Sequence, residues 1–321
     1  MGKSSRTKNR PANPSSGSAA SAGGGAEGAV GPRQPCPCGS GKRYKACHGS
    51  AGGAADVYVA RPFEGLPSEC DLIALRELVP AATAPITVRG AEDRVVKLCS
   101  LLPMAAPAMS RESGEVWLGL QVQHAYGDPS RDLAAVLQLA LDAEPGIVGL
   151  TFAPGEGPRL QDLVTDTTLD VTVHEGFDFW TSDLTDTDGL EDALAQANEA
   201  ATPTSRLTSV EAAYWTNVGP KEHLRWVMPE PESELLDALA RLHVDGADVI
   251  VPDARLVGMF RAHGLLVPVW DLPVGTGAEA VEEPAAAFRT ALEQALADTS
   301  DLTTEQRSAR AGLANRQVTI R

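Results

Sequence analysis

Apolar and polar positions from about residue 55 onward follow two alternating periods. Short runs that are apolar throughout or at every second position predict strands, and stripes at i, i+3, i+4 and i+7 predict helices. Strands are predicted at residues 57–63, 116–122, 147–152, 169–173, 210–215, 224–228, 249–251 and 265–272. The pattern therefore predicts a mixed α/β (α+β) globular body that is large enough for a real core.

Each predicted helix combines an apolar stripe with a start or stop signal. The helices run from an N-cap at Ser130 to Pro145-Gly146, from Asp253 to His263-Gly264, over residues 284–297, and onward from a capping box of Thr303 and Gln306. We expect the body to span residues 55–298, followed by a short helix and tail at 299–321.

Two helical segments of the body share a pattern at one constant offset. The pairs are Leu72 and Leu236, Ala74 and Ala238, Leu75 and Leu239, and Leu78 and Leu242. The match fits a duplication into two related halves. It fits equally well the frequency of Leu and Ala in any core helix, and both interpretations stay open.

Charge divides the chain of 321 residues, whose formal net charge is −16, into a basic leader and an acidic body. Residues 1–50 hold eight basic side chains and one acid, Glu27. Residues 1–34 are mostly Gly, Ser, Ala and Pro and cannot bury enough apolar surface to offset backbone entropy, which predicts a disordered tail. The positive charge also allows nucleic-acid binding through residues 1–50, although no aromatic residues are interleaved in the tail.

The sequence gives little reason to expect a membrane or secreted protein. Apolar runs fall short of the ~20 residues of a spanning helix. Pro and Ser follow the basic residues 1–10, where a signal peptide requires an apolar region. We therefore expect a cytoplasmic protein, and the excess of Arg over Lys is typical of high-GC bacteria.

Residues 35–50 concentrate four metal-ligating side chains in the spacing Cys-x-Cys-x8-Cys-His. The ligands are Cys36, Cys38, Cys47 and His48. Three thiolates and one imidazole form a tetrahedral zinc set. A disulfide between the first two cysteines would be strained, and a redox pair normally has two intervening residues. The spacing predicts one structural Zn²⁺ in a small knuckle.

The run Pro-Cys-Pro-Cys-Gly-Ser-Gly-Lys-Arg-Tyr-Lys-Ala-Cys-His-Gly at residues 35–49 resembles the SEC-C motif. This zinc-binding module stands at the C-terminus of the SecA preprotein translocase ATPase, where it is associated with a chaperone, phospholipid and the ribosome. The resemblance implies docking to protein partners linked to secretion or translation. It implies no motor activity, because the chain lacks a Gly-x4-Gly-Lys-Ser/Thr loop. The layout of the whole chain resembles an uncharacterised family of high-GC bacteria.

No familiar catalytic motif stands in the body. His174-Glu175 lacks the second His of a zincin. The Asp-rich run 183–189 mimics a calcium loop, but with Gly189 at loop position 6 the ends are Leu184 and Ala195, where Asp and Glu are required. Cys70 and Cys99 are expected to be buried thiols. Twelve acids lie in residues 151–200, where Arg159 is the only Lys or Arg, which suggests either solvated caps or a docking surface for a basic partner.

We name no catalytic residue and expect a non-enzymatic adapter that docks through its zinc knuckle. The alternatives are an enzyme with an unrecognised site, in which His124, His174 or Asp178 would be tested, and a nucleic-acid-associated factor.

Overall fold

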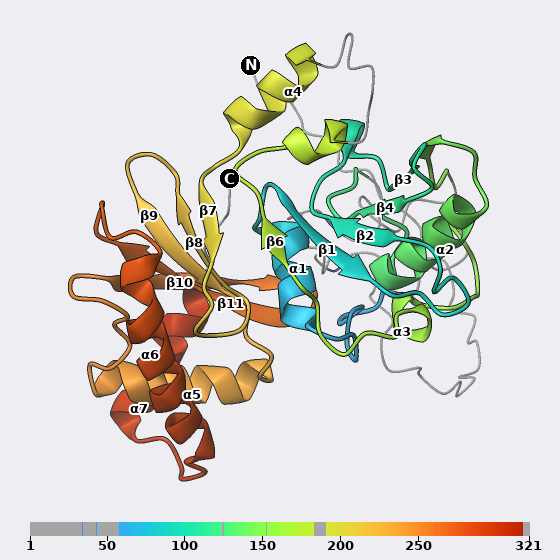
Figure 1. Ribbon diagram of the computed structural model, residues 1–321. Helices are drawn as coiled ribbons and strands as arrows, with labels where there is room; N and C mark the ends of the chain where they lie inside the picture. The colour runs from blue at the N-terminus through green and yellow to red at the C-terminus, as the bar shows by residue number, and fades with distance from the viewer. Residues whose placement is uncertain are drawn as a thin grey trace, which may run out of the picture.

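The computed structural model of the chain describes residues 34, 43, 58–123, 125–151, 153–182 and 191–316. These residues form two β-sheets with helices packed against them (Figure 1). The predicted mixed α/β body is therefore confirmed. Within the described ranges, no helix is long and apolar enough to cross a membrane.

The first sheet has six strands in the order β5-β3-β4-β2-β1-β6. Their bounds are β1 Ala82–Ile86, β2 Val96–Cys99, β3 Ala108–Ser110, β4 Val116–Gly119, β5 Gly146–Val148 and β6 Thr172–Val173. Strands β2 and β4 pair in parallel, with Leu98 opposite Leu118, and the other pairings are antiparallel. The carboxyl ends of β2 and β4 therefore meet at one edge of the sheet.

The second sheet has five strands in the order β10-β11-β9-β8-β7, all antiparallel. Their bounds are β7 Thr204–Arg206, β8 Ala213–Asn217, β9 Glu222–Trp226, β10 Arg255–Ala262 and β11 Leu265–Leu272. Apart from Asp271, β11 is buried along its whole length because both faces of this sheet are covered. This explains why residues 265–272 form an almost continuous apolar run.

The helices are α1 Glu69–Glu77, α2 Pro129–Leu141, α3 Leu160–Leu163, α4 Glu191–Ala200, α5 Glu232–Val244, α6 Glu279–Ala297 and α7 Thr304–Asn315, with 3₁₀ turns η2 Pro103–Ala105 and η3 Asp178–Thr181. Figure 1 shows α1 between the two sheets, with α5, α6 and α7 on the outer side of the second sheet. The capping box predicted at Thr303 and Gln306 is confirmed at the start of α7.

Two large cores follow from this layering. The first joins α1, α2 and one face of the first sheet to Tyr214, Val227 and Val267 of the second sheet. The second lies between the other face of the second sheet and helices α5, α6 and α7. Trp226, Trp270 and Phe288 meet there, with ring centroids 5.3–6.4 Å apart. Helices α1 and α5, which carry the repeated pattern, contribute to different cores, and the duplication stays a prediction.

The helix predicted from Asp253 to His263-Gly264 is wrong. Residues 255–262 form β10, and residues 263 and 264 form the two-residue turn into β11, because Ala262 pairs with Leu265. His263 and Gly264 both have positive φ, as a tight hairpin requires. Asp253 has a φ of 65° and lies in a turn, so it caps no helix.

Smaller corrections concern three other predicted elements. Residues 58–63 form no strand and lead through a bend into a turn, and residues 249–251 form no strand although Ile250 and Val251 are buried. Proline follows at position 252 and has no N–H to donate to a sheet. Asp128, not Ser130, caps α2, because Pro129 occupies its first turn. The other six predicted strands each overlap an observed one.

Candidate ligand pocket beside Arg76

The predicted zinc ligands Cys36, Cys38, Cys47 and His48 lie outside the described residues, as does His124. Their placement stays a prediction. Among the residues that the structure describes, no group of three or more His, Cys, Asp or Glu side chains could hold a metal ion.

A cavity of about 280 Å³ opens where the parallel strands β2 and β4 end. The loop after β2 supplies Met104–Pro107, the loop after β4 supplies Val122 and Gln123, and α2 supplies its first two turns. Ligands commonly bind in the crevice outside the carboxyl ends of parallel strands, next to the start of the following helix. The position of the cavity is thus typical of a binding site.

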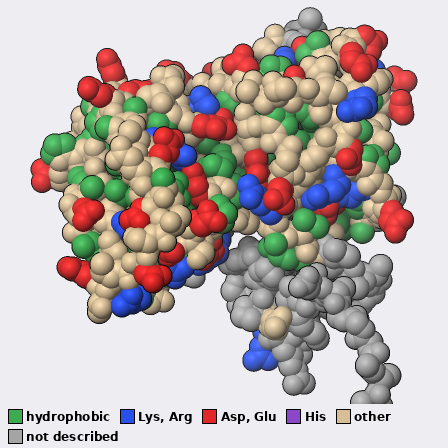
Figure 2. Space-filling model, turned by 90° about the horizontal axis from the view of Figure 1, so that it is seen from below, with side chains coloured by type: hydrophobic (Ala, Val, Ile, Leu, Met, Phe, Trp, Pro, Cys, Tyr) green, Lys and Arg blue, Asp and Glu red, His purple; other side chains and the backbone are tan. Residues whose placement is uncertain are grey.

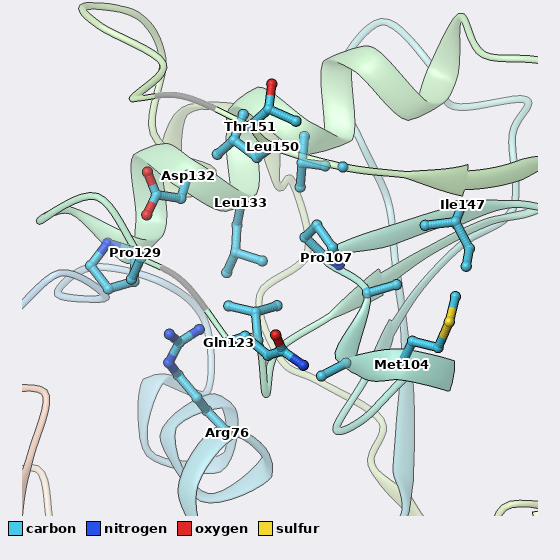
Figure 3. Close-up of a pocket in the computed structure, with 16 residues that line it drawn as sticks. Arg76, Met104, Pro107, Gln123, Pro129, Asp132, Leu133, Ile147, Leu150 and Thr151 are labelled. Atoms are coloured by element: carbon cyan, nitrogen blue, oxygen red, sulfur yellow. The ribbon is translucent and has the colours of Figure 1, made fainter. Parts of the chain in front are cut away.

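Charge and apolar surface occupy opposite ends of this pocket. Figure 3 shows Arg76 rising toward Pro129 and Asp132 at one end, and Met104 and Ile147 at the other. Arg76 and Asp132 are the charged residues of the lining that the structure describes. The pocket therefore suits a molecule with a polar head and an apolar remainder.

Arg76 stands in the last turn of α1, and its side chain is 10% exposed. Its Nη1 donates to the carbonyl oxygen of Leu120 at 2.6 Å, and its Nε lies 3.6 Å from a carboxylate oxygen of Glu77. Burial lowers its pKa, but an arginine remains charged at neutral pH. The second terminal nitrogen of the guanidinium, Nη2, has no hydrogen-bond partner among the described residues, and the side chain lines the pocket.

Asp132 lies in the first turns of α2 on the opposite side of the charged end. Its Oδ2 accepts a hydrogen bond of 2.7 Å from the backbone N–H of Tyr126. Burial raises the pKa of Asp132 to about 6, and the charge of Asp128 adds to this effect, while the Tyr126 bond and Arg76 act in the opposite direction. A carboxyl group that titrates near neutrality in a cavity is a common feature of functional sites.

We expect Asp132→Asn to stabilise the protein at pH 7 and to leave its stability at pH 4 unchanged. The unfolded pKa of Asp is about 3.9, so the native state binds more protons than the unfolded state between pH 4 and 6. Wild-type stability therefore falls as the pH rises through this window, whereas that of the variant does not. Full burial would correspond to about 3 kcal/mol, which partial exposure reduces to about 1–2 kcal/mol. Denaturant unfolding at pH 4 and 7 measures the difference, and equal free energies of unfolding at pH 7 would contradict it.

The loop between β2 and β3 carries backbone strain where it lines the pocket. Met104 and Ala105 have φ values of 58° and 51°, in the left-handed region that residues with a Cβ rarely enter. The Met104 side chain is 76% exposed at the rim. Strain of this kind is maintained by surrounding contacts and collects at ligand sites.

A second cavity of about 190 Å³ shares Arg76, Ala125 and Pro129 with the pocket. Its other walls include Tyr58, Val59 and Pro62, Arg261 at the end of β10 and His263 in the turn that follows. The backbone N–H of Val59 donates to the carbonyl oxygen of Gly127 at 3.3 Å. The segment that enters the body from the N-terminal side therefore packs beside the charged end of the pocket.

His174 and Asp178, named as candidates from the sequence, do not line the pocket. His174 lies 2.9 Å from the hydroxyl of Thr83 and stacks on Phe179, and burial lowers its pKa. Asp178 accepts a hydrogen bond from Asn198 of α4. Both contacts hold the segment that covers the other face of the first sheet.

Two of the described acids in residues 151–200 accept hydrogen bonds from backbone N–H groups. Asp162 bonds to the backbone N–H of Arg159 at the start of α3, and Asp166 accepts two hydrogen bonds from Thr87. Figure 2 shows acidic side chains scattered over the described part of the face in view. Solvated caps and a docking surface for a basic partner both stay predictions for residues 151–200. Cys70 and Cys99 are buried free thiols, as predicted.

Two family models match the chain. One is the SEC-C motif, at residues 33–50, and the other is a family of unknown function, DUF5926, at residues 62–321. No curated protein and no solved structure matches significantly. Because the second model spans well over half of the sequence, the chain belongs to the DUF5926 family and carries a SEC-C motif ahead of that domain.

Proposed function

We propose that this protein is a zinc-binding docking protein whose body binds a small molecule and catalyses no reaction. The SEC-C motif carries the docking half of the proposal. The pocket at the carboxyl ends of β2 and β4 supports the binding half.

The donor set of the motif fits zinc. Cys36, Cys38 and Cys47 supply thiolates and His48 supplies an imidazole, which together complete a tetrahedron. Four protein ligands leave no open position for water, so the metal would stabilise the fold of the knuckle without activating a substrate. Lys42, Arg43 and Lys45 place positive charge beside the net negative centre.

The described part of the chain brings the N-terminal side close to the pocket. Tyr58 and Val59 line a cavity that shares Arg76 with the pocket, and Val59 bonds to Gly127 in the loop before α2. This loop also holds the N–H of Tyr126 that bonds to Asp132. An occupant of the pocket would therefore contact a loop on which the segment coming from the motif rests. We propose that partner docking and ligand binding are served by adjoining surfaces.

We expect the double variant Cys36→Ser/Cys38→Ser to lose both zinc and partner capture. Elemental analysis of the wild type should give one zinc per chain, and the double variant should give none. Affinity capture should recover partners with the wild type only. The purified partners, and purified ribosomes tested beside them, should then rebind to the wild type and not to the double variant. Ser50→Ala, a change within the matched motif but outside the ligand set, is the control and should behave as the wild type.

Three outcomes would contradict the proposal. Zinc retained by the double variant would exclude this ligand set, and equal capture by both proteins would exclude docking through the motif. Turnover of a bound molecule that is lost in Asp132→Asn would make the body an enzyme. RNA binding that falls steeply with salt and requires residues 1–50 would favour a nucleic-acid factor instead.

A further inference from the structure

We infer that the pocket beside Arg76 binds a small zwitterion with an apolar tail, which is the chemistry of an α-amino acid with an aliphatic or thioether side chain. This inference names the ligand class for the binding half of the proposed function and rests on it. Three features of the pocket support the inference: a guanidinium with N–H donors beyond those that face Leu120 and Glu77, a carboxylate with one oxygen not hydrogen-bonded to described residues, and an apolar end of limited size.

The guanidinium of Arg76 is well placed to bind a carboxylate. One Nη1 hydrogen is engaged by the carbonyl oxygen of Leu120, and no described carboxylate other than that of Glu77 lies within 4 Å. Two parallel N–H donors of an arginine match the two oxygens of a carboxylate. Because the Arg76 side chain is only 10% exposed, few water molecules can hydrogen-bond to its guanidinium in place of a ligand carboxylate.

Asp132 supplies the opposite charge at the same end of the pocket. Its Oδ2 is bonded to the N–H of Tyr126, and Oδ1 has no hydrogen-bond partner among the described residues. No ion pair joins Asp132 to Arg76, although each charge influences the pKa of the other group. Both side chains line the same end of the pocket, and no described nitrogen–oxygen pair between them lies within 4 Å, so one ligand could contact both (Figure 3).

A zwitterion satisfies both groups at once, and simpler ions do not. A plain carboxylate bound at Arg76 would place its negative charge near Asp132. A plain amine bound at Asp132 would place its positive charge near Arg76. In either case one charged side chain of a partly buried site faces a like charge and has no ligand partner, which is costly. A ligand that carries both an ammonium and a carboxylate removes both costs.

The apolar end limits the size and nature of the tail. Its walls are formed by Met104, Leu133, Val136, Ile147 and Leu150. The volume of about 280 Å³ lies just below the usual range of ligand pockets, which is about 300–1,000 Å³. A cavity of this size suits a branched or thioether side chain. Met104 at the rim can adapt to tails of different shape because its thioether chain is flexible.

Calorimetric titration of the full-length wild-type protein tests the ligand class without any variant. The probes are L-leucine and L-methionine, together with 4-methylpentanoate, which lacks the ammonium of leucine, and 3-methylbutylamine, which lacks its carboxylate. We expect at least one amino acid to bind at least tenfold more tightly than both truncated analogues.

The dependence on pH gives a second and independent readout. An ammonium group requires the ionised form of Asp132, so the affinity for the amino acid should rise between pH 5 and 7. The affinity for 4-methylpentanoate should fall over the same range, because ionisation adds a negative charge beside it. In Asp132→Asn the rise should disappear and the affinity for the amino acid should drop at least tenfold at pH 7.

Arg76→Gln should weaken binding by a similar factor, while Asp142→Asn at the far end of α2, outside the pocket lining, should bind as the wild type does. Equal binding of the amino acid and 4-methylpentanoate, or no binding of either amino acid by the folded protein, would overturn the inference. The variant Cys36→Ser/Cys38→Ser separates the two proposals. If it loses zinc and still captures partners, docking through the motif is overturned. If it also still binds the amino acid, the inference about the pocket stands.

Discussion

Asp71→Ala is expected to lower the free energy of unfolding of the body by about 3–5 kcal/mol, the cost of breaking a buried charge pair. Asp71 is 1% exposed in the first turn of α1. It accepts two hydrogen bonds from Arg206 of β7, at 3.0 and 2.8 Å, and one of 2.6 Å from the hydroxyl of Tyr214 on β8. This triad ties α1, and with it the first core, to the second sheet.

The alanine variant leaves a guanidinium and a buried phenol without their acceptor. The hydroxyl of Tyr214 cannot reach water readily because this residue is 1% exposed. An unsatisfied buried donor costs about 1–3 kcal/mol by itself, and the unpaired charge of Arg206 adds to this cost. Chemical denaturation measures the loss.

Glu293→Ala is the matched control. Glu293 forms an i,i+4 pair with Arg289 on the surface of α6, and its side chain is 59% exposed. Such a pair contributes about 0.3–0.5 kcal/mol. If both alanine variants lost the same small amount of stability, the triad would not be a structural link between the sheets.

Local pattern was sufficient to predict elements whose burial is simple. Residues 265–272 are apolar on both faces, and a strand covered on both sides requires this. The capping box is a pair of hydrogen bonds between Thr303 and Gln306, so the spacing of these two residues in the sequence is enough to identify it. The SEC-C motif is equally local, because four ligands lie within 13 residues.

Local pattern was misleading where one set of apolar positions fits two periods. In residues 255–262, Leu256 and Met259 are three apart, which predicts a helical stripe. They share a face of β10 instead, because a bulge between Leu256 and Gly258 shifts the register by one residue. The two positive φ angles at His263 and Gly264 then turn the chain back into β11.

The pocket could not be predicted because its residues meet only through the topology of the first sheet. Arg76 ends α1, Met104 follows β2, and Ile147 belongs to β5. The parallel pairing of β2 with β4 brings their following loops together, and no segment of the sequence contains that information. Asp132 gave no local signal, because an acid in the first turn of a helix is ordinary and generally stabilising.

Gly119→Ala is expected to destabilise the protein by about 1–3 kcal/mol and to abolish binding in the pocket. A Cβ at this position would lie 2.2 Å from the backbone oxygen of Ala106, so the loop before β3 would have to move. That loop cannot shift freely, since Gly119 donates to the carbonyl oxygen of Pro107 at 3.0 Å. It also holds Met104 and Pro107, which form a wall of the pocket.

Gly312→Ala is the matched control for this change. Gly312 lies inside α7 with no atom near the added Cβ, so alanine there should stabilise the helix by about 0.5–1 kcal/mol. Denaturant unfolding and calorimetric titration with L-leucine and L-methionine are to be measured on both variants. If Gly119→Ala retained wild-type stability and wild-type binding, the close packing of β4 against the loop would not support the pocket. If both glycine variants lost stability equally, the effect would reflect backbone freedom in general and not the contact with Ala106.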